Sequence, residues 1–215
     1  MLSFTSAGTP IEVEWFAARA SGDGPAVLLL HGADGLTFAD GYRLAARSLA
    51  ASGYHVAFLH YLDRTNDRRV AYARLRHDFP LWAGTVRDGL NWLAQRPGVD
   101  AGRLGLVGVS LGAALAFDTA ASDARVRAIV DYFGPLPDGL AARRPRLPPT
   151  LVLHGARDPV VPVSQAHAIA RLLAEQGTPH ELQVYPDQGH GLTGAAQLDA
   201  AARTARFLDR HVGLR

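Results

Sequence analysis

Five short runs of almost uninterrupted apolar residues restrict the fold of this chain more than any other feature of its sequence. They read AVLLLHG, HVAFLHY, RLGLVGV, VRAIVDYF and TLVLHG, and they begin at residues 26, 55, 103, 126 and 150. A strand that is apolar on both faces must be covered on both faces, which is typical of the central strands of a parallel sheet. The segment IEVEWFAA, residues 11–18, begins with alternating apolar and polar residues, which predicts a half-exposed strand near a sheet edge.

Helical patterns separate these runs. Apolar residues recur at helical spacing over 82–93, 169–173 and 198–208, and the stretch 41–51 is rich in alanine. Glycine or proline follows the first three of these helices along the chain, which is how helices commonly end. Strands that alternate with helices predict an α/β fold, a mostly parallel central sheet with helices on both faces. We expect one such domain over residues 1–215, with ligands binding beyond the carboxyl ends of the strands.

Composition removes several classes of function. Hydrophobic residues make up 48% of the chain and charged residues 20%, as in an ordinary globular protein. All 22 basic residues are arginine and the net charge is only +2, so we expect no nucleic-acid partner. The absence of cysteine excludes disulfides, a thiol nucleophile and thiolate metal ligands. The sequence has no signal-peptide pattern and no apolar run of the roughly 18 residues that a membrane span needs, so we expect a cytoplasmic protein with no membrane partner.

One serine stands where a predicted strand becomes a predicted helix. Gly108-Val109-Ser110-Leu111-Gly112 matches the pattern Gly-x-Ser-x-Gly, and alanines at 113, 114 and 116 follow it. A serine on so sharp a turn has a strained backbone, and glycines two residues away on each side relieve the crowding. We therefore interpret Ser110 as a nucleophile, against the alternative of an incidental Gly-Ser turn.

A serine nucleophile needs a base and a carboxylate that orients the base. His190 lies between two glycines in YPDQGHGL, after a further predicted strand that ends at Tyr185. Asp158 lies in LVLHGARDPVVP, five residues beyond a predicted strand, and we prefer it to Asp131 as the acid. Asp131 lies inside an apolar run, where we expect it to be paired or to face the surface. His31 and His154, which also precede glycines at strand ends, are interpreted as loop supports.

The last part of such a site is an oxyanion hole, two backbone N–H groups that stabilise the negative charge of a tetrahedral intermediate. We expect one donor to be Leu111, directly after the nucleophile, and the other to be Ala33 in the HGADG loop. An ordinary tight turn is the alternative for that loop.

With these residues in place, the chain resembles the dienelactone hydrolase family of α/β-hydrolases over residues 26–212. The likeness is strongest in VGVSLGAALAF, LVLHGARDPVVPV, YPDQGHGL and the closing helix DAAARTARFLDRH. The resemblance implies a compact α/β-hydrolase fold without a lid domain, an esterase activity on lactones or other carboxylic esters, and no metal or organic cofactor. It also implies that the chain order Ser110, Asp158, His190 is that of a catalytic triad.

The sequence departs from dienelactone hydrolase proper at two places. That enzyme carries a cysteine at the sharp turn and a glutamate in the loop after an early strand. This chain has Ser110 at the turn, and the loop reads His31-Gly32-Ala33 without a glutamate. The departures point to a serine-nucleophile branch of the family and away from dienelactone itself as the substrate.

The stretch YLDRTNDRRVAYARLRHDF, residues 61–79, follows a strand and carries five arginines, of which Arg64 is nearest the strand end. A guanidinium can hold a substrate carboxylate, which makes Arg64 a candidate substrate-binding residue; a solvated helix face is the alternative.

Three functions therefore stay open. The first is a serine hydrolase that cleaves small carboxylic esters or lactones through an acyl-enzyme, as a monomer or homodimer. The second is amide, peptide or thioester hydrolysis by the same triad, and the third is a non-catalytic binding module on a hydrolase scaffold.

Overall fold

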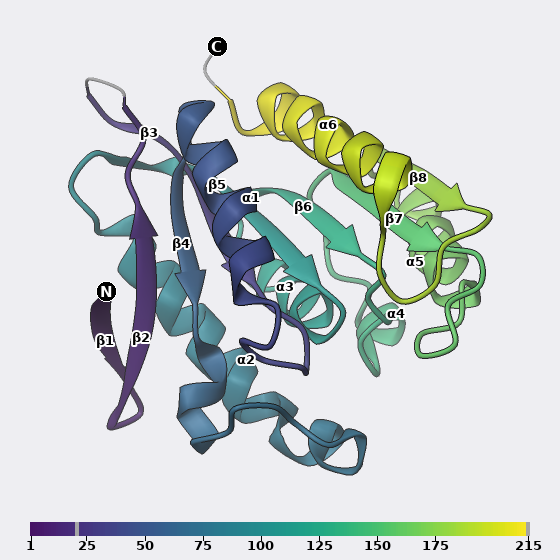
Figure 1. Ribbon diagram of the computed structural model, residues 1–215, viewed down its shortest axis with the longest axis horizontal. Helices are drawn as coiled ribbons and strands as arrows, with labels where there is room; N and C mark the ends of the chain where they lie inside the picture. Colours follow the sequence, from purple (N-terminus) through teal and green to yellow (C-terminus); the bar gives the residue numbers. More distant parts are fainter. Residues whose placement is uncertain (20–21, 214–215) are drawn as a thin grey trace.

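Eight strands form one sheet at the centre of the molecule, and the computed structural model describes residues 1–19 and 22–213. The strand order is β1-β2-β4-β3-β5-β6-β7-β8. The six strands from β4 to β8 run parallel, while β1 and β2 are antiparallel to their neighbours (Figure 1). The elements in chain order are β1 Leu2–Ser6, β2 Thr9–Phe16, β3 Gly24–Leu30, α1 Ala39–Ala51, β4 His55–Leu59, the 3₁₀ helix η1 Tyr61–Thr65, α2 Tyr72–Ala94, β5 Val99–Val109, α3 Leu111–Ala120, β6 Val126–Tyr132, α4 Leu140–Arg143, β7 Thr150–Gly155, α5 Ser164–Glu175, β8 His180–Tyr185 and α6 Gly194–His211.

Helices cover both faces of the sheet, as the apolar runs predict. Every residue of β3, β4 and β7 is buried. On one face of the sheet, Leu49 of α1 and Phe207 of α6 belong to the same apolar cluster as Phe58 of β4. On the other face, Trp82 of α2 and Leu115 of α3 belong to a second cluster. Figure 1 shows α1 and α6 in front of the sheet and the second layer of helices behind it. This two-sided burial is the physical reason for the nearly continuous apolar runs.

The structure adds two elements of detail that local sequence pattern does not predict. The half-exposed strand expected over residues 11–18 is β2, but the edge of the sheet is β1, which the sequence analysis did not predict. A tight turn at Ala7 and Gly8, both with positive φ, joins the two strands. In addition, α2 begins at Tyr72 and continues through Pro80, so the second half of the arginine-rich stretch 61–79 is helix.

The carboxyl ends of the parallel strands carry the loops that matter for function. The loops after β3, β5, β7 and β8 all leave the sheet at this end, because their strands run in the same direction. Residues separated by many positions in the sequence are therefore brought to one edge of the sheet.

Candidate active site

Ser110 lies on the sharp turn between β5 and α3. Its φ of 53° and ψ of −116° place it in a sparsely populated region of backbone conformation. A Cβ on Gly108 would stand 2.4 Å from Cα of Ala113, and a Cβ on Gly112 would stand 2.5 Å from the carbonyl oxygen of His31. Glycine is therefore required at both positions, so that the turn can form and the helix can pack closely on the sheet.

His190 reaches Ser110 from the loop between β8 and α6. Its Nε2 lies 3.0 Å from Oγ of Ser110, within hydrogen-bond distance. The ring of Phe133, which follows β6, packs edge-on against the imidazole with the ring centroids 4.9 Å apart. The imidazole is thus held against the serine by Phe133, the last residue of the apolar run VRAIVDYF, which was not selected as a site residue from the sequence.

Asp158 holds the other side of the imidazole. Its Oδ2 lies 2.7 Å from Nδ1 of His190, and its Oδ1 accepts hydrogen bonds from the N–H groups of Val160 and Val161 at 2.8 and 2.9 Å. The carboxylate is fully buried. Because it can only accept, Nδ1 carries a proton, and Nε2 of a neutral His190 is left to accept the proton of the serine hydroxyl.

His154 lies beside the same carboxylate, with Nε2 at 3.4 Å from Oδ2 of Asp158. The same nitrogen lies 2.9 Å from the carbonyl oxygen of Val161, so His154 fastens the loop after β7, as expected for a loop support. Burial lowers the pKa of His154, which favours its neutral form. The spacing of four residues between His154 and Asp158 is the sequence signal that links His154 to the acid.

Asp131, the rival acid, is buried elsewhere. Its Oδ1 accepts a hydrogen bond from N–H of Gly134 at 2.7 Å, and its Oδ2 has no partner among the described residues. Of the two alternatives expected for Asp131, a surface-facing side chain is wrong, and pairing holds for one oxygen only. Burial raises the pKa of Asp131 to about 8. Within the described chain, His190 forms a hydrogen bond with Asp158 and none with Asp131.

The two expected oxyanion donors, Leu111 and Ala33, lie in segments that meet at the turn of Ser110. Leu111 is the first residue of α3, where N–H groups have no partner within the helix. Ala33 lies in the loop after β3. The start of this loop packs closely on α3, because a Cβ on Gly112 would stand 2.5 Å from the carbonyl oxygens of Leu30 and His31. No hydrogen bond among the described residues uses the N–H of Leu111 or of Ala33.

Asp34 brings a carboxyl to the same loop. Its Oδ1 lies 2.6 Å from the point where a Cβ on Gly32 would stand, and Cβ of Ser110 lies 3.5 Å from that point. Burial raises the pKa of Asp34, while the positive charge of a protonated His190 acts in the opposite direction. The sequence analysis did not select Asp34, although it lies within HGADG.

Arg64 lies in η1, and its Nη1 donates to Oγ1 of Thr9 at 3.2 Å. Thr9 begins β2, which β4 and β3 separate from β5 and its serine. A role of Arg64 in substrate binding stays a prediction. Elsewhere in the arginine-rich stretch, Arg74 of α2 pairs with Asp67 at 2.8 Å and with the buried Asp78 at 2.6 Å.

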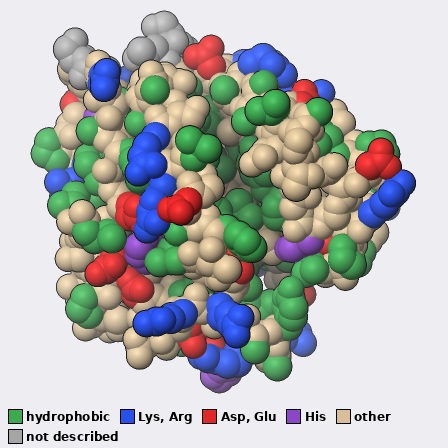
Figure 2. Space-filling view, viewed as in Figure 1, with side chains coloured by type: hydrophobic (Ala, Val, Ile, Leu, Met, Phe, Trp, Pro, Cys, Tyr) green, Lys and Arg blue, Asp and Glu red, His purple; other side chains and the backbone are tan. Residues whose placement is uncertain are grey.

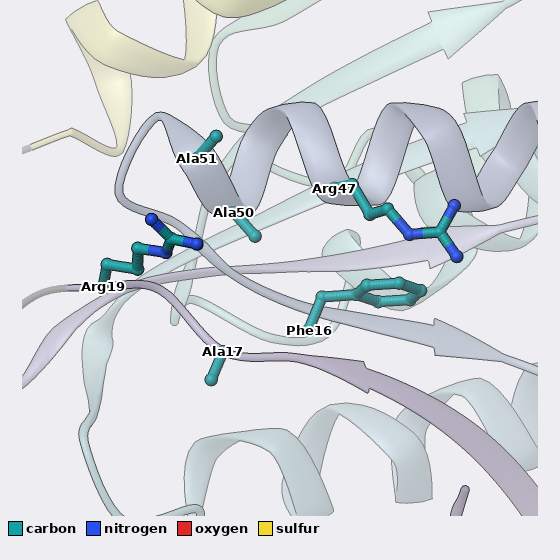
Figure 3. Close-up of a pocket in the computed structure, with 6 residues that line it drawn as sticks. All are labelled: Phe16, Ala17, Arg19, Arg47, Ala50 and Ala51. Carbon is teal, nitrogen blue, oxygen red and sulfur yellow. The ribbon is translucent and has the colours of Figure 1, made fainter.

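One surface hollow lies away from this site. Its volume is about 550 Å³, and Phe16, Arg19 and Arg47 line it together with three alanines between the end of β2 and α1 (Figure 3). Phe16 pairs with Val56 at the amino end of β4, whereas Ser110 follows the carboxyl end of β5. A smaller hollow, about 400 Å³, adjoins the loop after β3 and is lined there by His31 and Gly35.

Charged side chains do not gather into a metal-binding cluster in the described part of the chain. Basic and acidic side chains are mixed over the face shown in Figure 2. Within residues 1–19 and 22–213, no cluster of three or more histidine, aspartate or glutamate side chains could hold a metal ion. None of the described helices is long and apolar enough to cross a membrane.

Two sequence comparisons relate the chain to known proteins. The sequence profile described as "Dienelactone hydrolase family" matches residues 13–210. A Salmonella typhimurium protein named "Putative carboxymethylenebutenolidase" is 29% identical over 106 residues, which is 45% of this chain and 39% of that protein.

Solved structures show the same fold at low sequence identity. A dienelactone hydrolase from Anabaena variabilis superposes with a TM-score of 0.80 at 20% identity, covering 98% of this chain and 96% of its own. A dienelactone hydrolase-like promiscuous phosphotriesterase from metagenomic libraries gives 0.84 at 21%, covering 98% and 97%. An acylaminoacyl peptidase from Pyrococcus horikoshii gives 0.83 at 13%, covering all of this chain and 42% of that chain.

Proposed function

The chain belongs to the dienelactone hydrolase family, and we propose that it is a serine hydrolase that cleaves carboxylic esters or lactones through an acyl-enzyme intermediate. Membership of the family and the α/β-hydrolase fold are both as predicted from the sequence. One observation carries the proposal, namely the continuous chain from Oγ of Ser110 through the imidazole of His190 to the carboxylate of Asp158.

In the first half of the proposed reaction, Oγ of Ser110 attacks the acyl carbon while Nε2 of His190 takes the hydroxyl proton. The N–H groups of Leu111 and Ala33 stabilise the oxyanion, and the carboxylate of Asp158 stabilises the imidazolium. The tetrahedral intermediate then collapses, the carbon–oxygen bond to the leaving alcohol breaks, and His190 gives its proton to that alcohol. In a lactone the alcohol stays attached to the acyl group.

In the second half, water attacks the acyl carbon and gives a proton to His190. The new tetrahedral intermediate expels Ser110, which recovers its proton from the imidazolium, and the carboxylic acid leaves. No step of the proposed reaction needs a cofactor. The substrate is a small molecule, and the protein acts as a monomer or homodimer.

The test is hydrolysis of short p-nitrophenyl esters by the wild-type protein and by Ser110→Ala, with Ser122→Ala as a serine control at the end of α3. We expect Ser110→Ala to lose turnover and labelling by a fluorophosphonate probe while its melting temperature stays close to that of the wild type. Turnover retained in Ser110→Ala would refute the proposed nucleophile. A folded wild-type protein that is inert to esters and to the probe would indicate the binding module instead. Matched ester, amide and thioester substrates then decide which leaving group the enzyme prefers.

A further inference from the structure

Two successive peptide groups lie directly before the proposed oxyanion donor Ala33, and side chains hold both of them. The first joins His31 to Gly32. Its N–H donates to Oη of Tyr42 on α1 at 3.1 Å, and its carbonyl oxygen accepts from Oη of Tyr61 on η1 at 2.8 Å. Because a peptide group is planar, these two hydrogen bonds on opposite edges fix its orientation.

The second peptide group joins Gly32 to Ala33, and it carries the N–H that would meet the oxyanion. Its carbonyl oxygen lies 2.8 Å from Nδ1 of His31, 3.1 Å from N of Gly35 and 3.3 Å from Oη of Tyr61. In a trans peptide the N–H points away from the carbonyl. The donors that hold the carbonyl on one side, which include the one Tyr61 proton shared with the carbonyl oxygen of His31, therefore direct the N–H of Ala33 to the other side.

The remaining backbone group of Ala33 is also held, since its carbonyl oxygen accepts from N–H of Val70 at 2.7 Å. The N–H of Ala33 itself has no hydrogen-bond partner among the described residues. An unused donor between fixed neighbours is the arrangement that a preorganised oxyanion hole requires.

The side chains that hold these peptides are themselves rigid. Tyr61 is fully buried, and the ring of His31 stacks on it with centroids 4.2 Å apart. Tyr42 stacks on Phe58 of β4 at 5.2 Å. Burial lowers the pKa of His31 to about 4, so the imidazole is neutral at pH 7; a carbonyl can only accept, so Nδ1 carries the proton.

We propose that Tyr42 and Tyr61 are positioning residues that set the oxyanion hole: their hydroxyls lock the peptide before Gly32, and with His31 they aim the N–H of Ala33. The inference rests on the proposed hydrolase function. It assigns to helix α1 a part in catalysis through a side chain that does not contact the substrate.

The test compares Tyr42→Phe with the wild type and with Tyr54→Phe. The first variant keeps the ring on Phe58 and removes only the acceptor of the Gly32 N–H. The control also removes a buried tyrosine hydroxyl, but one that lies just before β4 at the far end of the sheet and has no partner in the described structure. Loss of a whole oxyanion donor lowers kcat by about 100-fold to 1000-fold, so a misdirected donor should lower kcat by about 10-fold to 100-fold.

We expect the KM of a p-nitrophenyl ester to change by less than about twofold, because the misdirected donor acts mainly on the charge of the transition state. The affinity for a boronic acid, which forms a tetrahedral adduct with the serine, should fall in proportion to kcat. Tyr54→Phe should leave both quantities unchanged. Tyr61→Phe removes donors from both peptides and should lower kcat further, which provides a second variant if Tyr42→Phe folds poorly.

Full kcat in Tyr42→Phe and in Tyr61→Phe would overturn the inference while leaving the proposed function intact. A fall in kcat accompanied by an equal fall in the amount of folded protein, with unchanged boronic-acid affinity, would show a merely structural role and would overturn it as well. A wild-type protein without hydrolase activity would instead refute the proposed function on which the inference rests.

Discussion

Replacing Asp131 by asparagine should make the protein more stable at neutral pH. The side chain is fully buried at the end of β6, one oxygen accepts from Gly134, and the other has no partner in the described chain. Burial raises its pKa from 3.8 to about 8. The carboxyl is therefore protonated and neutral in the folded protein at pH 7, but ionised in the unfolded chain.

The sign and size of the effect follow from this difference in pKa. Between pH 4 and pH 7 the folded protein binds one proton that the unfolded chain releases, so the free energy of unfolding falls as the pH rises. Each pH unit is worth about 1.36 kcal/mol, which gives a loss of about 4 kcal/mol by pH 7. Asparagine keeps an oxygen for Gly134 and binds no proton, so Asp131→Asn should avoid this loss.

Urea unfolding followed by circular dichroism at pH 4.5, 6 and 7.5 measures the free energy of unfolding of both proteins. We expect them to differ by less than about 1 kcal/mol at pH 4.5, with the variant increasingly more stable as the pH rises. The control is Asp40→Asn, whose carboxylate is fully exposed on α1. A difference between Asp131→Asn and the wild type that does not change with pH would refute the assignment of a neutral buried carboxyl.

Other variants test the site and its supports. Asp158→Asn should lower kcat by about 10⁴-fold on p-nitrophenyl acetate because His190 loses its orienting carboxylate, whereas Asp131→Asn should keep kcat; the opposite ranking would exchange the two acids. Gly108→Ala would place a Cβ 2.4 Å from the backbone of α3 and should yield little folded protein, whereas the control Gly84→Ala, on the open surface of α2, should raise stability by about 1 kcal/mol. Thermal melting of both variants measures the two effects, and a wild-type melting temperature for Gly108→Ala would contradict the packing argument. Asp34→Asn should raise kcat/KM for an acidic ester several-fold relative to its neutral analogue, because a carboxylate beside the serine repels an anion; an equal change for both esters would exclude this role.

Local pattern was sufficient for most of the fold. The central strands are apolar on both faces, and the helices carry end signals, so each could be predicted from its own residues. Strand β1 was missed because a five-residue edge strand with an exposed face has little apolar pattern of its own. The first turns of α2 were missed because arginines and Pro80 obscure the helical periodicity, and the structure accommodates them through packing against η1 and α3.

Part of the candidate site could likewise be predicted from local sequence, and part could not. The turn at Ser110 depends on the residues directly around it, so the sequence alone predicts it, and it also places His190 and Asp158 on loops at the right end of the sheet. Neither the burial of Asp131 nor its neutral charge could be predicted, because both depend on what packs over β6.

By itself, the sequence determined the order of the central strands and of the helices between them, the sharp turn that presents a serine, and a short set of partners for it. Only the tertiary structure decided which carboxylate meets His190, and that Tyr42 and Tyr61 hold the loop before Ala33. The reason is physical: propensity and periodicity act between neighbours in the chain, whereas these contacts join elements that only the order of strands in the sheet and the packing of helices bring together.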